Sequence, residues 1–202
     1  MSVSASAPEL ILASKSASRR AMLDAAGVAY EAIPADIDER AVEAGLADAT
    51  PPEIAEALSV AKAAELAKSH GERLVLGSDS LVVVGGRRFD KPTSRENAAE
   101  HLRYFSGKPL ELHSAAALVR GDTCVWSAPS QALLHVRQLS DAFIEHYLER
   151  EWPAVGYTVG VFRIEAMGVQ LFDRIDGDQF TILGMPLLAV LAALREEGVI
   201  IA

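Results

Sequence analysis

The chain has 202 residues, half of them hydrophobic, and its 19 basic and 28 acidic side chains give a formal net charge of −9. This length and hydrophobic content suffice for a buried core, so we expect one domain over residues 1–202 and not a disordered chain. The acidic balance excludes a general affinity for nucleic acid or anionic lipid, because both repel such a protein unless its cations gather locally.

The cysteine content and the apolar runs bear on the cellular compartment. The single cysteine, Cys124, can form no internal disulfide, and no Cys/His cluster has zinc spacing. The residues before Leu10 lack the basic region of a secretory signal. The longest apolar run, residues 185–194, is shorter than the roughly 20 residues that span a bilayer. We therefore expect a soluble, cytoplasmic protein that does not enter a membrane.

The first predicted elements are a strand over residues 10–12 and a helix that ends at Gly27. Between them lies ASKSASRR, which contains three alternating serines and three cations: Ser14, Ser16, Ser18, Lys15, Arg19 and Arg20. Hydroxyls and cations beside the first amides of a helix form an arrangement that binds phosphate. The segment has no glycine, which excludes the Walker loop and the dinucleotide fingerprint. An ordinary helix cap with solvated arginines is the alternative.

Two further polar features follow in the first third of the chain. Residues 28–33 alternate like a strand and lead into PADIDE, whose last residue is Glu39. Carboxylates at such a strand end either hold a metal or form a solvated turn.

Thr50, Pro51 and Glu53 predict a capped helix that runs to about residue 69. Lys62 lies at the edge of its apolar stripe, where the pattern alone indicates a solvated lysine.

An aspartate and a lysine lie near the ends of the next predicted strands. Residues 74–76 and 81–84 predict two strands joined by GSDS, which contains Asp79. Because a buried unpaired charge costs several kcal/mol, Asp79 either serves a cleft or metal or lies in a solvated turn. Gly85 and Gly86 predict a hairpin into residues 87–89. The DKP that follows places Lys91 in a restrained loop, which suits phosphate binding.

The rest of the chain predicts a sheet with further helices. In order, we expect a helix capped by Thr93 and Glu96 that ends at Gly107, antiparallel strands over 110–118 and 124–136, a helix from Ser140 to about Trp152, a strand over 169–172, a polar turn with Asp173, Asp176 and Asp178, and a helix over 186–197.

Together these motifs resemble the Maf family of nucleoside triphosphate pyrophosphatases, which is also linked to inhibition of septum formation. The resemblance covers almost the whole chain and rests on ASKSASRR, PADIDE, AKAAELA around Lys62, GSDSLVV around Asp79, DKP at Lys91, FSG at 105–107 and GDQFTILGMPL at 177–187. It implies an α/β fold with a mixed sheet, flanking helices and two lobes around a deep cleft, like that of inosine triphosphatases. It also implies a homodimer.

The reaction implied by the resemblance is hydrolysis of a nucleoside triphosphate between its α and β phosphates, which gives the monophosphate and pyrophosphate. Asp79 would accept the proton of water, and Glu39 and Asp79 would hold a divalent cation, Mg²⁺ or Mn²⁺. The residues implied to bind the phosphates are Ser14, Ser16, Arg19, Arg20, Lys62 and Lys91. Positioning and charge neutralisation dominate such chemistry, which suits these side chains.

Three positions bear on the nucleobase. Ser18 stands where the 7-methyl-GTP branch of the family has tryptophan and the dTTP/UTP branch has arginine, and Ser80 matches neither branch. Glu165 matches the 7-methyl-GTP branch, and a carboxylate there can pair with a cationic base. These residues favour a modified or guanine-type base over dTTP or UTP. Ala17 replaces a proline that is common in the family.

Two other functions remain open at this point. A cleft of this kind can serve a regulator of cell division that binds nucleotide without hydrolysing it, although the retained Asp79 argues against this. A similar cleft can also carry out house-cleaning hydrolysis of deaminated purine nucleotides.

Overall fold

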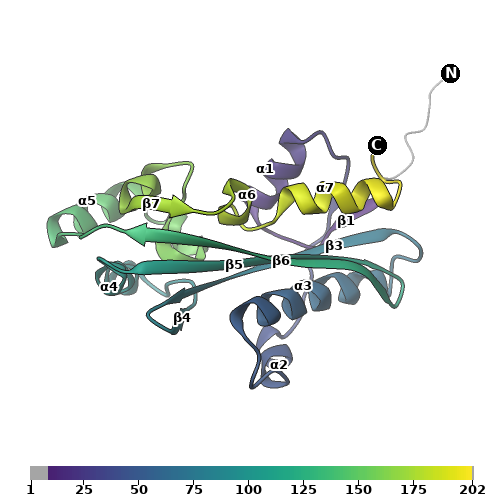
Figure 1. Cartoon of the computed structure of the whole chain (residues 1–202), viewed down its shortest axis with the longest axis horizontal. Coiled ribbons are helices and arrows are strands. Elements are labelled where there is room, and N and C mark those ends of the chain that lie inside the picture. Colours follow the sequence, from purple (N-terminus) through teal and green to yellow (C-terminus); the bar gives the residue numbers. More distant parts are fainter. Residues whose placement is uncertain (1–8, 202) are drawn as a thin grey trace. The chain divides into compact units, whose positions relative to one another are not determined.

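The computed structural model describes residues 9–201 (Figure 1). Residues 1–8, for which the sequence predicts no secretory signal, lie outside this range. The chain forms two compact units: the first contains the residues up to Asp79, Ser114–Ser130 and the residues from Leu183, and the second contains Ser80–His113 and Gln131–Ile182. A single domain over residues 1–202 stays a prediction.

The helices and strands of the described residues alternate along the chain. In order they are β1 Leu10–Leu12, α1 Ala17–Ala25, β2 Glu31–Ala32, α2 Glu39–Ala44, α3 Pro51–Ala67, β3 Leu74–Val84, β4 Arg87–Phe89, α4 Arg95–Phe105, β5 Pro109–Arg120, β6 Thr123–Val136, α5 Asp141–Glu151, β7 Phe172–Asp176, α6 Gln179–Ile182 and α7 Leu187–Glu196. Three short 3₁₀ turns, at Ala154–Tyr157, Val159–Val161 and Met167–Leu171, separate α5 from β7.

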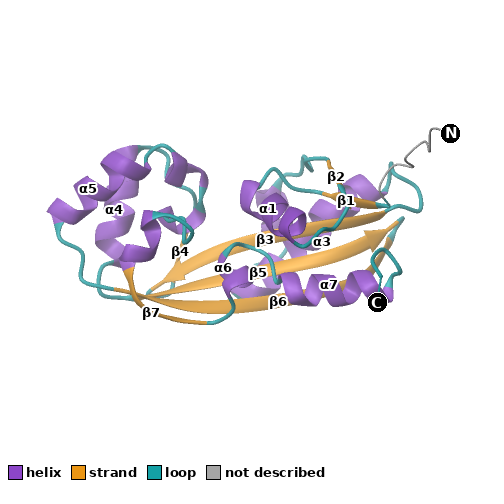
Figure 2. Cartoon of the chain, turned by 90° about the horizontal axis from the view of Figure 1, so that it is seen from above, coloured by secondary structure: helices purple, strands orange, loops and turns teal. Residues whose placement is uncertain are grey.

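The strands form a mixed sheet, which confirms the predicted fold class. They hydrogen bond in the order β2-β1-β3-β5-β6-β7, with β4 on β3. In the first unit β1 runs parallel to β2 and β3, and Leu10 pairs with Leu74. In the second unit β4 is antiparallel to β3, and β7 is antiparallel to β6. Figure 2 shows the long strands in orange and the helices in purple.

Helices cover both faces of the sheet in the first unit, with α1 and α7 on one side and α3 on the other (Figure 1). α3 packs on the sheet through a buried apolar cluster that joins this helix to three strands: Ile11, Ala13, Ala63, Leu66, Ala67, Val75 and Val119. Burial of such side chains is the main favourable term in folding. In the second unit α4 and α5 are joined by ion pairs between Arg95 and Glu145 and between Arg103 and Asp141.

Several predicted elements are confirmed because their signals are local. β1 has the predicted bounds, and the amide of Thr50 donates to Glu53 at 2.7 Å in the predicted capping box of α3. Ser140 caps α5, and its hydroxyl accepts from the Phe143 amide. The glycine hairpin between β3 and β4 is also present, with Gly85 and Gly86 at positive φ. Among residues 9–201, no helix combines the length and apolar character needed to cross a bilayer.

Five predictions about elements are wrong. Asp173 and Asp176 lie in the strand β7 and not in the predicted polar turn. The predicted loop at residues 77–80 does not exist, because β3 continues through it as one strand. The last strand is Phe172–Asp176, since the residues before it form a 3₁₀ turn and not the strand predicted at 169–172. The cap of α4 is Ser94 and not Thr93. The strand predicted at 28–33 shrinks to Glu31–Ala32.

The close packing of α3 on β3 depends on Gly77. A Cβ atom at this position would lie 2.0 Å from the carbonyl oxygen of Ser59 and 2.9 Å from the backbone nitrogen of Ala63, both in α3. Backbone atoms cannot move aside as a flexible side chain can, so only glycine allows this approach. The sequence therefore places α3 directly against the strand that carries Asp79.

We predict that Gly77→Ala lowers the free energy of unfolding by about 2 kcal/mol or more, because the added methyl group must separate α3 from β3. Urea unfolding followed by circular dichroism measures the change. The matched control is Gly45→Ala at the end of α2, where a Cβ atom would make an ordinary 3.5 Å contact and φ is −79°. Equal stability of the two variants would contradict the packing argument.

Candidate functional site

The serines of the first loop cap α1 and bond to one another. The hydroxyl of Ser16 accepts from the backbone amide of Arg19 at 3.4 Å, and the amide of Ser16 donates to the hydroxyl of Ser14 at 3.2 Å. The hydroxyls of Ser16 and Ser18 lie 2.9 Å apart. Alternating serines therefore hold the start of α1 directly after the buried strand β1.

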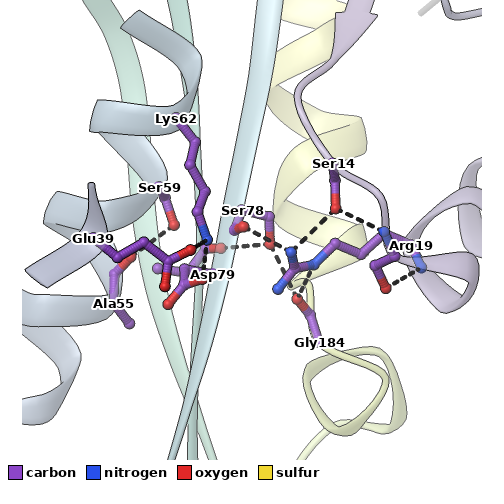
Figure 3. Close-up of polar contacts among 11 residues, drawn as sticks. Ser14, Arg19, Glu39, Ala55, Ser59, Lys62, Ser78, Asp79 and Gly184 are labelled. Atoms are coloured by element: carbon purple, nitrogen blue, oxygen red, sulfur yellow. Dashed lines mark hydrogen bonds and ion pairs between the residues drawn. The ribbon is translucent and has the colours of Figure 1, made fainter. Parts of the chain in front are cut away.

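Arg19 turns inward from α1 and binds backbone carbonyls from two other segments (Figure 3). Its Nε donates to the carbonyl of Gly184 at 2.9 Å, and its Nη1 donates to the carbonyl of Ser78 at 2.7 Å and to the Ser14 hydroxyl at 3.3 Å. Burial lowers the pKa of Arg19, while the charges of Asp79 and Glu39 act against this shift. Since an arginine starts from a very high pKa, the guanidinium stays charged at neutral pH.

The alternation of β3 directs neighbouring side chains to opposite faces of the sheet. Ser78 donates to the carbonyls of Ala115 and Gly184 at 2.7 and 3.0 Å, so its hydroxyl and Arg19 share the Gly184 carbonyl. Asp79 points to the other face, together with Gly77 two residues before it. Figure 3 shows Lys62 approaching Asp79 from one side of β3 and Arg19 approaching Ser78 from the other.

Lys62 lies between two carboxylates. Its ammonium group contacts Glu39 at 2.7 Å and forms a short ion pair with Oδ1 of Asp79. The Lys62 and Asp79 side chains are only 14% and 11% exposed, whereas that of Glu39 is 48% exposed. Glu39 is the first residue of α2, and the Asp38 carboxylate caps this helix by accepting from the Ala41 amide. Two cations and two anions thus balance around β3.

The two carboxylates suit a divalent cation that also binds phosphate. Glu39 and Asp79 approach the same ammonium group, and carboxylate oxygens are the ligands that Mg²⁺ and Mn²⁺ prefer. Among residues 9–201, no three His, Cys, Asp or Glu side chains gather in a way that could hold a metal ion. A divalent ion held by Glu39 and Asp79 would thus have to take its remaining ligands from water and substrate, as Mg²⁺ commonly does.

Comparison with known proteins shows the family of the chain. The family described as Maf-like protein matches residues 9–197. The chain belongs to the Maf family. It is 48% identical to a 7-methyl-GTP pyrophosphatase of Rhizobium meliloti (strain 1021), over 96% of this chain and 98% of that protein. It is 46% identical to a nucleoside triphosphate pyrophosphatase of Sphingopyxis alaskensis, over 94% and 97% of the two chains.

Solved structures give a weaker likeness. A HAM1 protein from Coxiella burnetii matches 63% of this chain and 72% of its own, with 18% identity and a TM-score of 0.42.

The structure brings part of the predicted Maf site together within the first unit. Ser14, Ser16, Arg19, Lys62, Asp79 and Glu39 join in the contacts described above. Arg20 is exposed and donates to the carbonyl of Lys15 at 3.0 Å. Asp79 is buried in a strand, so the solvated turn considered from the sequence is excluded.

Three predicted residues lie in the second unit. Ser80 is half-buried in β3, Lys91 is exposed in the coil between β4 and α4, and Glu165 is exposed in a turn. Their roles stay predictions.

Sequence reasoning missed the groups that hold the candidate site in place. Ser78 is fully buried although it lies among the turn-forming residues GSDS, and apolar runs on both sides were the signal of a continuous strand. The Gly184 carbonyl accepts two hydrogen bonds, and a backbone acceptor leaves no trace in side-chain chemistry. Only its place in the motif GDQFTILGMPL connected this segment to the site.

We predict that Lys62→Met lowers the free energy of unfolding by about 3 kcal/mol, because it leaves the nearly buried Asp79 carboxylate without its cation. Urea unfolding at neutral pH measures the loss. Lys68→Met, at an exposed position at the end of the same helix, is the control and should change stability by less than about 0.5 kcal/mol. A Lys62 variant as stable as the control would show that the ion pair contributes little.

Proposed function

We propose that the protein is a nucleoside triphosphate pyrophosphatase, which hydrolyses the bond between the α and β phosphates and releases pyrophosphate. The observation that carries the proposal is Lys62 held between Glu39 and Asp79, beside the half-buried Arg19, in a chain of the Maf family. Relatives that are almost half identical over nearly the whole chain bear names of this activity, which supports the proposal.

Asp79 is the general base in this proposal. Lys62 pairs with Oδ1 of this carboxylate. Its other oxygen takes a proton from water as the water oxygen bonds to phosphorus and the bridging phosphoanhydride bond breaks. The electron pair of the broken bond leaves with pyrophosphate when a nucleoside monophosphate is formed. The atoms and electrons that move in these steps come from water, the triphosphate and this carboxylate.

The cations of the chain bind and orient the phosphates. Ser14, Ser16 and the first amides of α1 offer donors next to the positive charge of Arg19, and Lys62 lies beside the reacting carboxylate. We also assign Arg20 and Lys91 to phosphate binding, as the Maf resemblance implies. Glu39 and Asp79 would hold Mg²⁺ or Mn²⁺, which supplies further positive charge beside the phosphates when bound.

The preferred substrate in our proposal is a nucleoside triphosphate that resembles 7-methyl-GTP in its base. Glu165 can pair with a cationic purine, and one relative carries the name 7-methyl-GTP pyrophosphatase. Ser18 and Ser80 stand at the other two positions that distinguish the branches. The competing substrates are dTTP, UTP and the triphosphates of deaminated purines.

We also propose that the protein acts in the cytoplasm as a homodimer without binding nucleic acid. Its one cysteine, Cys124, is exposed and free, which suits a reducing compartment. The acidic net charge of −9 disfavours contact with nucleic acid.

The test is pyrophosphate release from a panel of 7-methyl-GTP, GTP, dTTP, UTP, ITP and XTP with Mg²⁺ or Mn²⁺. We predict that Asp79→Asn lowers kcat by about a hundredfold or more, because the amide cannot accept the proton of water. The asparagine oxygen can still accept from Lys62, so the variant should fold. Asp122→Asn, in the exposed turn between β5 and β6, is the matched control.

The same panel separates catalysis from regulation. Nucleotide binding by calorimetry with no turnover on any substrate would favour the non-catalytic regulator of cell division. Addition of a chelator should abolish turnover and leave the circular dichroism spectrum unchanged, since the two carboxylates that would bind the metal are already paired with Lys62.

We predict that Glu165→Gln changes the ratio of kcat/KM for 7-methyl-GTP over dTTP by about tenfold, because an amide cannot pair with a cationic base. Pyrophosphate release at several substrate concentrations measures both constants. Glu149→Gln, a change of the same kind at an exposed position of α5, is the control. An unchanged ranking of nucleotides in the Glu165 variant would remove the argument for the base.

A further inference from the structure

Two buried polar side chains lie on one face of α5. Tyr147 is fully buried and Glu151 is 7% exposed, and their spacing of four residues places them on the same side of the helix. Both reach the segment of residues 161–168, which follows α5 and contains Glu165. Burial raises the pKa of Tyr147, which keeps its hydroxyl a donor.

Glu151 uses each of its oxygens for a different part of this segment. Oε2 accepts from Nε and Nη2 of Arg163 at 3.1 and 3.0 Å, and Oε1 accepts from the backbone amide of Met167 at 3.3 Å. A buried carboxylate is stable only with such partners. Arg163 and Met167 flank Glu165 two residues away on each side, so this one side chain holds both ends of the turn.

The segment is closed and strained. The carbonyl of Arg163 accepts from the Ala166 amide at 3.1 Å, which makes Glu165 the third residue of the turn. Gly168 packs against the same turn, since a Cβ atom there would lie 2.4 Å from the Arg163 carbonyl oxygen. Val161 has a φ of +58°, a conformation that is rare for a β-branched residue, and its carbonyl accepts from the Tyr147 hydroxyl at 2.9 Å.

We propose that Tyr147 and Glu151 are positioning residues for nucleotide selectivity, because they fix the backbone on both sides of Glu165. This inference rests on the proposed function. A carboxylate distinguishes one base edge from another only when its own backbone is held to within about 0.5 Å. Strained backbone persists where the surrounding structure enforces it, and such places are often ligand-binding segments. The hydrogen bonds of Tyr147 and Glu151 both fix the backbone around Glu165 and hold the strained Val161 in place.

Glu151→Gln tests the role sharply, since an amide has one oxygen where the carboxylate uses two. The glutamine can accept from Arg163 or from Met167, and its NH₂ group then faces the remaining donor. We expect the ratio of kcat/KM for 7-methyl-GTP over dTTP to move toward 1 by about tenfold, as in Glu165→Gln, because one hydrogen bond to a charged group is lost. Glu145→Gln, at an exposed position of α5 where Glu145 pairs with Arg95 of α4, should keep the wild-type ratio.

Tyr147→Phe is a second variant that keeps the buried ring and removes only the hydrogen bond to Val161. It should shift the ratio in the same direction by a smaller factor. Hydrogen exchange should show faster exchange of the Met167 amide in Glu151→Gln, and Glu151→Asp should restore part of the ratio. These readouts distinguish positioning from a general loss of stability, which would lower turnover of every nucleotide equally.

Each outcome has one meaning. A changed ratio in both α5 variants with an intact Glu145 control supports the inference. Active variants that rank the nucleotides as the wild type does, or lose all of them equally, overturn it while the proposed function stands. A wild-type protein that cleaves no nucleotide on the panel overturns the proposed function and the selectivity role together.

Discussion

The candidate site depends on the contact between α3 and β3 at Gly77. A residue with a side chain would hold the helix away from the strand, because the atoms it meets belong to the backbone of α3. Side chains two residues apart on a strand share a face, so the face that brings Gly77 against α3 also directs Asp79 toward that helix. Lys62, which lies between the contact residues Ser59 and Ala63 along α3, then reaches the carboxylate. One missing Cβ atom thus determines which cation Asp79 meets.

The same alternation along β3 determines which side chains lie on the opposite face of the strand. Ser78 points away from α3 and donates to two carbonyls, and its own carbonyl accepts from Arg19. Arg19 is half-buried, and a cation that loses water is stable only when polar groups replace that water. Carbonyls of β3 and of the segment before α7 provide that replacement. The arginine therefore joins three segments that are far apart in the sequence, and its charge remains close to Asp79 and Glu39.

The sequence predicted those elements whose signals are local, such as β1, the Thr50 capping box and the glycine hairpin after β3. It failed at residues 77–80, because Gly, Ser and Asp are typical of turns and nothing local shows that Ser78 and Asp79 find partners inside the fold. The last strand was predicted a few residues too early in the chain, because a short apolar run can form either a 3₁₀ turn or a strand. Within the first unit, the resemblance brought together residues that spacing alone could not, and Arg19, Lys62 and Asp79 do lie around one strand. The hydroxyl of Ser78 and the carbonyl of Gly184 were beyond prediction because their roles depend on tertiary neighbours.

Each unit contains a carboxylate whose position is fixed by a neighbouring helix. Asp79 lies inside a strand and Glu165 lies in a short turn, so groups outside its own segment fix the position of each carboxylate. In the first unit a glycine brings the neighbouring helix close enough for a lysine to hold Asp79. In the second unit Gly168 closes the turn around Glu165, and Tyr147 and Glu151 attach it to α5 at Val161, Arg163 and Met167. Because buried polar groups cannot lose these partners without cost, they transmit the rigidity of a helix to a segment with little regular structure of its own. The position of each carboxylate therefore depends on the neighbouring helix, α3 or α5, as much as on its own backbone.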